Sequence, residues 1–232
     1  MEREDWRNFE YSSGPDVMDR YASFEDLRRE EPEESHRIRL REGSRGVAII
    51  APHGGLIEPG TSEVADEIAG SEYTLYCFEG ARDARNFELH ITSANFDEPV
   101  GSSIVARAHI VIAIHGCKGE EDVVSVGGLN DRLGGLILAE LKDADFPARK
   151  GGIRGFRGID PRNICNRGRT GKGVQIEISH GLRRKMRSTQ DATSGKAAEE
   201  TLRRLAGAIR KAIALALKDE FGTAPQVSSS IE

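Results

Sequence analysis

Short runs of apolar, often β-branched residues alternate along the chain with longer segments of helical periodicity. The apolar runs are typical of strands and lie at residues 46–51, 73–80, 87–93, 109–116, 122–128 and 173–179. Between them, residues 61–70 and 130–145 have the apolar spacing of helices. Strands that alternate with helices and are apolar on both faces predict a single α/β domain, with a mixed, mostly parallel sheet flanked by helices.

The two ends of the chain differ from this pattern. Residues 1–35 are polar and end in an acidic run, which predicts an N-terminal appendage with a short helix capped by Ser23. Residues 36–222 contain every predicted strand and form the α/β domain. Its last helix has the clearest periodicity, at residues 195–222, and we expect it to cover one face of the sheet. The polar residues 223–232 predict a disordered tail.

Length and composition narrow the classes of function. A chain of 232 residues with 38% hydrophobic content suits one domain with its own core. No apolar run approaches the roughly 20 residues that cross a bilayer, and the N-terminus lacks an apolar signal core, so we expect no membrane contact and a cytoplasmic location. If a phage encodes the protein, the alternative to a cytoplasmic location is release of the protein by lysis of the host cell. Three cysteines without CxxC spacing favour reduced thiols.

A glycine-rich segment at residues 149–172 is strongly cationic. It has eight Lys or Arg residues and only one acidic residue, Asp160, whereas the whole chain has a net charge of −5. Such a segment is poorly suited to a core, and its local positive field would concentrate an anionic ligand. The alternative is that its charges are simply solvated, as most charged side chains are.

Residues with catalytic chemistry occur at the ends of three apolar runs. His53 follows the first run, His115 ends the fourth, and Glu177 lies near the end of the last. Open α/β sheets bind ligands beyond the carboxyl ends of their strands, so we expect these three side chains near one edge of the sheet.

Glu58 follows His53 by five residues. On a helix this spacing would separate the two side chains by about 140°, so a loop must bring them together, and Gly54 and Gly55 permit its tight path. Two imidazoles and one carboxylate form a ligand set of catalytic zinc that leaves a fourth position for water. The sequence therefore predicts zinc ligation by His53, Glu58 and His115.

His90 is ambiguous. It lies inside a predicted strand, yet the polar residues Thr92 and Ser93 follow it and fit the edge of a site. A single histidine is more often a structural residue held by hydrogen bonds. The zinc hypothesis therefore depends on the paired occurrence of His53 and His115.

Longer motifs resemble those of the phage-type poly-γ-glutamate hydrolase family, in the order APHGGLIEPGTSEVADEIA, FEG, LHITSANFDEP, IHG, NICNRG and GVQIEISHGLR. The resemblance extends from about residue 20 to about residue 217. It implies a zinc carboxypeptidase-like fold with one zinc at the edge of a mixed α/β sheet. It also implies that His53, Glu58 and His115 bind this zinc and that Glu177 is the catalytic carboxylate.

The activity implied by the resemblance is hydrolysis of γ-glutamyl amide bonds, which would make residues 36–222 a catalytic domain. Zinc would activate a water molecule, and Glu177 would pass the proton of this water to the leaving amine. Poly-γ-glutamate is a polyanion, and guanidinium groups bind carboxylates in bidentate pairs. We expect the substrate to contact Arg154, Arg157, Arg162, Asn166, Arg167 and His90.

Other functions share parts of this pattern. The same zinc site would suit a hydrolase of small N-acyl amino acids, or of an aminoacyl ester on tRNA whose phosphates the arginines would contact. A non-catalytic nucleic-acid-binding domain would need only the cationic segment. The acidic remainder of the chain disfavours this function, and so does the scarcity of aromatic residues in the segment, where Phe156 is the only one. A metal-free domain with hydrogen-bonded histidines is the remaining alternative. The sequence leaves the oligomeric state open.

Overall fold

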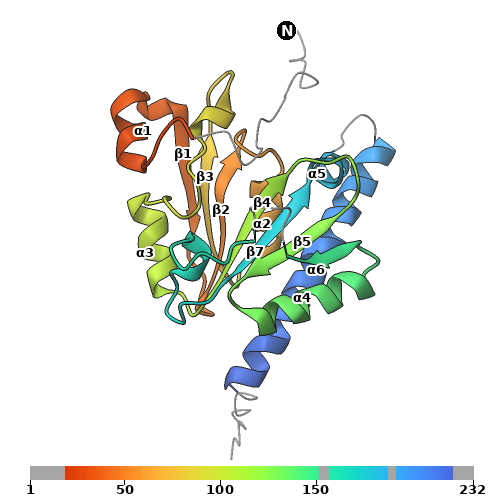
Figure 1. Ribbon diagram of the computed structural model, residues 1–232. Coiled ribbons are helices and arrows are strands. Elements are labelled where there is room, and N and C mark those ends of the chain that lie inside the picture. The colour runs from red at the N-terminus through yellow and green to blue at the C-terminus, as the bar shows by residue number, and fades with distance from the viewer. Residues whose placement is uncertain (1–18, 152–156, 188–191, 222–232) are drawn as a thin grey trace, which may run out of the picture.

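The computed structural model describes residues 19–151, 157–187 and 192–221, with a seven-stranded sheet at their centre (Figure 1). The strands are β1 (His36–Arg41), β2 (Val47–Gly55), β3 (Thr74–Gly80), β4 (Ile110–Cys117), β5 (Val124–Gly128), β6 (Ala148–Lys150) and β7 (Val174–Ser179). Their order in the sheet is β1-β3-β2-β4-β7-β5-β6. Strands β3, β2, β4 and β7 are parallel, β6 is parallel to β5, and the β1–β3 and β5–β7 pairs are antiparallel.

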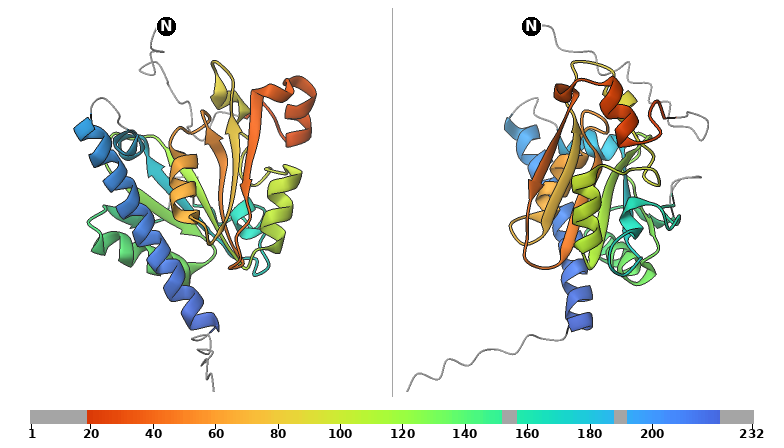
Figure 2. Two further views of the ribbon diagram at one scale, coloured as in Figure 1. Left: turned by 180° about the vertical axis from the view of Figure 1, so that it is seen from behind. Right: turned by 90° about the vertical axis from the view of Figure 1, so that its left-hand side faces the viewer.

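Helices pack on both faces of this sheet, as Figure 2 shows. One face is covered by α2 (Thr61–Ala69), α4 (Asp131–Asp143), α5 (His180–Met186) and α6 (Ala192–Phe221). The other face is covered by α1 (Phe24–Glu30) and α3 (Pro99–Arg107). Three short 3-10 helices lie in the connecting segments: η2 (Glu33–Ser35), η3 (Asn86–Leu89) and η4 (Ile164–Asn166). The predicted α/β architecture, with a mixed, mostly parallel sheet between helices, is confirmed.

Successive residues of the central strands enter two different cores. In β2, Ile49 faces the first core, between the sheet and α2, α4, α5 and α6, whereas Ile50 faces the second core, next to α1 and α3. This period of two is a property of extended chain. Both cores are apolar, and for this reason the parallel strands read as continuous hydrophobic runs in the sequence.

The N-terminal segment contributes to the second core. Ser23 caps α1, as its position predicts, and its Oγ accepts a hydrogen bond from the backbone N–H of Asp26 at 3.2 Å. Tyr21 and Leu27 are fully buried among the residues of the second core. Residues 19–35 are therefore packed against the α/β domain. The predicted tail at residues 223–232 lies outside the described residues.

The predicted strand at residues 87–93 is wrong. This stretch contains η3 and then irregular chain, because no described strand lies beside it to pair with. Its alternating pattern arises because Leu89 and Ile91 are both buried. The sequence also failed to predict β1 and β6. Both are edge strands rich in arginine or lysine, and β6 is three residues long, so neither has the apolar run of a central strand.

The helices and cysteines bear on the expected environment of the protein. In the described parts of the chain, no helix is both long and apolar enough to span a bilayer. The three cysteines, Cys77, Cys117 and Cys165, are buried and unpaired. Burial raises the pKa of each thiol to about 12, so thiolates are scarce at neutral pH.

Replacing Ile209 of α6 by alanine should destabilise the protein by about 2–5 kcal/mol, because a fully buried side chain is lost from the first core and a cavity remains. The matched control is Leu215→Ala in the same helix, where the side chain is 37% exposed and the expected change is within about 0.5 kcal/mol. Urea unfolding monitored by circular dichroism measures both. Equal effects of the two substitutions would contradict this packing of α6.

Candidate active site

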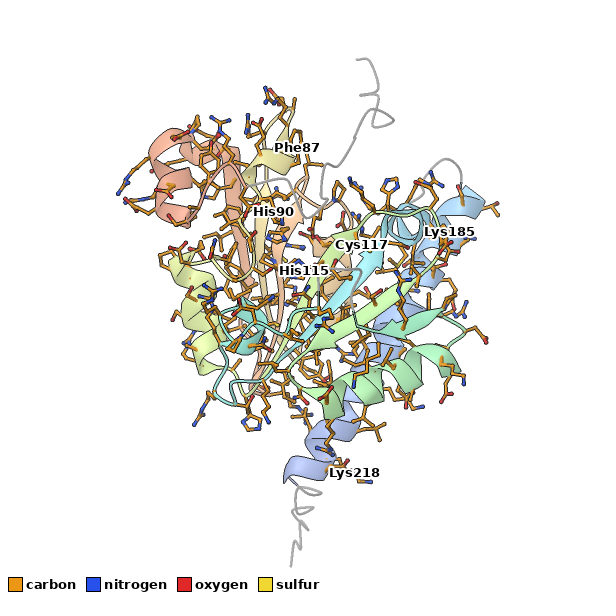
Figure 3. The ribbon with its side chains drawn as sticks, in the orientation of Figure 1. Phe87, His90, His115, Cys117, Lys185 and Lys218 are labelled. Atoms are coloured by element: carbon orange, nitrogen blue, oxygen red, sulfur yellow. The ribbon has the colours of Figure 1, made fainter. Side chains whose placement is uncertain are left out.

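The ends of β2, β4 and β7 bring three predicted residues to one edge of the sheet. His115 and Glu177 lie directly opposite each other on the adjacent parallel strands β4 and β7. Ala113, two residues before His115, belongs to the second core, so His115 and Glu177 face the same side as that core. Figure 3 shows His115 near the end of its strand, with His90 close by.

A bulge in β2 places His53 on this same side. Ala51 pairs with Cys77 and Gly54 pairs with Glu79, so one extra residue of β2 lies between the two pairs. In a regular strand His53 would share the face of Ala51, which is part of the first core. The extra residue reverses this direction, and the ring of His53 meets the rings of His90 and His115 instead.

His53, Glu58 and His115 form a tight buried cluster. Nδ1 of His53 is 3.1 Å from Nδ1 of His115 and 3.3 Å from Oε1 of Glu58. Nδ1 of His115 is 3.8 Å from Oε2 of Glu58. A backbone hydrogen bond closes the loop between His53 and Glu58: the N–H of Glu58 donates to the carbonyl of His53 at 3.0 Å. The structure thus brings the three predicted metal ligands together.

The hydrogen bonds around this cluster direct lone pairs toward its centre. Nε2 of His53 donates to the carbonyl of Ile91 at 2.8 Å, so Nδ1 carries the lone pair when the ring is neutral. Burial lowers the pKa of His53, but the adjacent Glu58 outweighs it and raises this pKa in the metal-free protein. Nε2 of His115 lies 3.4 Å from Oγ of Ser93, and the N–H of Gly116 donates to Oε2 of Glu58 at 2.7 Å. Metal-binding histidines and carboxylates have outer partners of this kind. The donor set therefore fits a divalent cation such as zinc.

His90 lies next to the cluster as an alternative ligand. Its ring centroid is 3.9 Å from that of His53, and ligand atoms of His53, Glu58 and His90 all lie within 4.8 Å of one another. Nδ1 of His90 bonds to Oδ1 of Asp19 at 2.7 Å, and the other oxygen of Asp19 accepts the N–H of Thr92. Asp19 thereby fixes the imidazole, with Nε2 left to interact. The sequence contained no local signal for Asp19, because 71 residues separate it from His90.

The two buried carboxyl groups have opposite pKa shifts. Burial raises the pKa of Glu177 to about 8, and the negative charge of Glu58 contributes to this rise. Burial acts in the same direction on Glu58, but the adjacent His53 and His115 outweigh it and lower the pKa of Glu58 to about 2. Burial also lowers the pKa of His115 to about 3. Carboxyl groups whose pKa values are pushed apart in one site are typical of acid–base catalysis.

Two amide side chains hold Glu177 in place. Nε2 of Gln175 donates to Oε1 of Glu177 at 2.8 Å, and Nδ2 of Asn163 donates to Oε1 of Gln175 at 2.8 Å. Sequence reasoning missed both residues. The strand period of two was a usable signal for Gln175, because it lies two positions before Glu177 on the same face. Asn163 comes from the loop before η4, and no periodicity marks it.

The cationic segment crosses the sheet close to this carboxyl group. The Cα hydrogen of Gly158 faces Gln175, since a Cβ there would lie 2.8 Å from the Cβ of Gln175. The backbone N–H of Ile164 donates to the carbonyl of Ser93 at 2.9 Å. Residues 158–164 of the segment therefore lie beside Gln175, the hydrogen-bond partner of Glu177, and beside the loop that carries His90.

The predicted substrate-binding residues of this segment have different surroundings. Arg157 and Arg162 are exposed, and Arg162 pairs with Asp160 at 2.8 Å. Asn166 is buried, and its amide bonds to four backbone groups of the surrounding loops. The guanidinium of Arg167 is half buried and donates to the carbonyl of Phe96. Arg154 lies outside the described residues.

Both a solved structure and a protein-family model are similar to this chain. The structure is similar to that of bacteriophage poly-γ-glutamate hydrolase, with a TM-score of 0.77 and 31% sequence identity over 86% of this chain and 98% of that one. The protein is a hydrolase with an α/β fold. Residues 21–207 match the poly-gamma-glutamate hydrolase family, and the chain belongs to this family.

Curated relatives come from Bacillus subtilis (strain 168). The UPF0714 protein YndL is 38% identical over 72% of this chain and 67% of its own length. The SPbeta prophage-derived UPF0714 protein YoqZ is 40% identical over 75% of this chain and 63% of its own length. The structure is also similar to that of a zinc-free form of YndL, with a TM-score of 0.78 and 32% sequence identity over 86% of this chain and 99% of that one. The chain thus spans about two thirds of the length of YndL and YoqZ.

The raised pKa of Glu177 has a consequence for stability. A carboxyl group whose pKa is higher in the folded than in the unfolded state stabilises the folded protein. This stabilisation is complete at pH values below the pKa of the unfolded state and is lost as the pH rises through the pKa of the folded state. In chelator-treated protein, Glu177→Gln should therefore gain stability relative to wild type between pH 5 and pH 8, by at most about 1.4 kcal/mol per pH unit. Urea unfolding at several pH values measures this. The exposed Glu67→Gln is the control, and a stability difference between Glu177→Gln and wild type that stays constant with pH would contradict the shift.

Proposed function

We propose that this protein is a zinc-dependent hydrolase that cleaves the γ-glutamyl amide bonds of poly-γ-glutamate. The observation that carries the proposal is the buried cluster of His53, Glu58 and His115 beside the carboxyl group of Glu177. Membership of the poly-gamma-glutamate hydrolase family supports the substrate, and the existence of a zinc-free form of the related YndL supports the metal.

His53, Glu58 and His115 are the proposed zinc ligands, and His90 is the alternative third ligand. The ring of His115 is favoured because its Nδ1 lies 3.1 Å from Nδ1 of His53 and 3.8 Å from Oε2 of Glu58. When bound, zinc would polarise the scissile carbonyl, activate water and favour the ionised form of the nearby carboxyl group.

Glu177 is the proposed general base and acid. It lies opposite His115 on the next strand, and Gln175 holds one of its two oxygens, which leaves the other to act on the substrate. Water adds to the carbonyl carbon as Glu177 accepts its proton, and the C–N bond breaks as Glu177 returns this proton to the leaving amine. A free carboxylate and a free amine are the products.

The substrate is proposed to reach this site along the cationic segment. Poly-γ-glutamate has one free α-carboxylate per residue, and a guanidinium binds a carboxylate with two parallel hydrogen bonds. Arg157 and Arg162 are exposed and belong to the segment that packs on Gln175, the hydrogen-bond partner of Glu177, so they are candidates for this contact. His90, next to the ligands, is placed to contact the group that is cleaved.

Metal analysis tests the ligand set without knowledge of the substrate. Wild type reconstituted with zinc should hold about one zinc per chain, and His53→Ala, Glu58→Gln and His115→Ala should bind it about 10–100-fold more weakly or not at all. His90→Ala should retain zinc, whereas zinc lost from His90→Ala and retained by His115→Ala would reassign the third ligand. Glu177→Gln should keep its zinc but lose about 10²–10⁴-fold in kcat. A wild type without zinc after reconstitution would refute the mechanism.

Salt tests the role of the cationic segment. Raising the ionic strength should increase KM for poly-γ-glutamate more than it lowers kcat, because screening weakens the attraction between arginines and a polyanion. Steady-state kinetics between about 10 mM and 0.5 M salt measure this, with Debye lengths of about 30 Å at the low end. A KM that does not change with salt would contradict it. A steep logarithmic salt dependence of RNA affinity would instead favour an aminoacyl-tRNA substrate.

A further inference from the structure

Arg183 is a buried cation that lies directly behind the candidate active site. It belongs to α5, which follows β7 without a loop, and it is 3% exposed. Its guanidinium donates three hydrogen bonds, all to backbone carbonyls: Nε to Ile178 at 3.1 Å, one terminal nitrogen to Pro59 at 2.6 Å and the other to Cys117 at 3.2 Å. Within the described residues, Arg183 has no carboxylate partner in an ion pair.

The three carbonyls belong to the three segments that carry the site. Pro59 directly follows Glu58, Ile178 directly follows Glu177, and Cys117 is two residues after His115. These segments are the loop after β2, the end of β7 and the end of β4. One planar group therefore connects the backbones of two proposed zinc ligands and of the proposed general base.

The surrounding backbone is shaped around this guanidinium. A Cβ at Gly116 would lie 2.4 Å from Cζ of Arg183, so only glycine fits between His115 and Cys117. Gly60, with φ of +102°, packs against the aliphatic part of the same side chain, since a Cβ there would lie 3.2 Å from the Cβ of Arg183. The positive charge also lies near enough to Glu177 to act against the rise in its pKa.

We propose that Arg183 is a positioning residue for catalysis, which sets the distances between Glu58, His115 and Glu177 and places a fixed positive charge near Glu177. This inference rests on the proposed hydrolase function. The guanidinium is occupied by three backbone carbonyls, so it acts through the segments that it joins. A lysine cannot replace it, because a single ammonium group lacks the planar fork that reaches three separate carbonyls.

The test uses Arg183→Lys and Arg183→Met in the full chain, with Arg184→Met as the matched control. Arg184 is the next residue of α5, is half exposed and pairs with Glu120. Both Arg183 variants should lose about 10–100-fold in kcat with a much smaller change in KM, and their zinc Kd, from calorimetry on chelator-treated protein, should rise about 10-fold or more. The loss should be smaller for lysine, which keeps the charge. Arg184→Met should resemble wild type.

A role in folding alone predicts a different result. In that case both variants would unfold at lower temperature, while kcat and zinc Kd per folded chain stayed within about twofold of wild type, and the inference would be wrong. Thermal unfolding of each variant supplies the folded fraction for this comparison. A wild type without zinc and without hydrolase activity would refute the proposed function first. If the wild type has both zinc and hydrolase activity, and the Arg183 variants have the same kcat and zinc Kd as the wild type, only the inference on Arg183 is refuted.

Discussion

The bulge in β2 is the constraint on which the site depends. Without its extra residue, His53 would point into the first core under α2, and the imidazole of His115 would face only the carboxylate of Glu58. The bulge is possible because Gly54 and Gly55 follow it: a Cβ at Gly54 would lie 2.3 Å from Oγ of Ser62, and Gly55 has φ of +61°. A local irregularity of one strand thus assembles side chains that the regular sheet would keep on opposite faces.

The protonation states around the site explain how two acidic side chains can be buried together. An isolated buried carboxylate is unfavourable, and two close together repel each other. Glu58 is ionised and is stabilised by His53 and the N–H of Gly116, whereas Glu177, whose pKa burial raises to about 8, is largely protonated at neutral pH and bonds to Gln175. Each compensating group also makes a bond to another segment. The polar network therefore fixes geometry as well as charge, which is what a preorganised catalytic site requires.

The parts of the site that follow strand logic could be predicted from the sequence, and the rest could not. His53, His115 and Glu177 each lie two residues before the end of adjacent parallel strands, so the topology predicts that all three reach one edge of the sheet. The face on which His53 lies depends on the bulge in β2, which the sequence pattern did not predict. Asp19 and Arg183 act through hydrogen bonds to segments distant in sequence, Asp19 to His90 and Thr92, and Arg183 mainly to the backbone carbonyls of Pro59 and Cys117. Such contacts have no periodicity and no fixed spacing. The same limit applies to residues 87–93, where burial alternates without a neighbouring strand.

The contact between Asp19 and His90 also defines where the working unit begins. By hydrophobic pattern alone, the polar stretch before β1 looks dispensable, and a shortened protein starting at residue 36 would keep every strand of the sheet. It would nevertheless lose Tyr21 and Leu27 from the second core and the carboxylate that orients His90. The minimal enzyme is therefore longer than the minimal sheet. Any library, fusion or fragment of this protein needs to preserve residues 19–35 together with the strands.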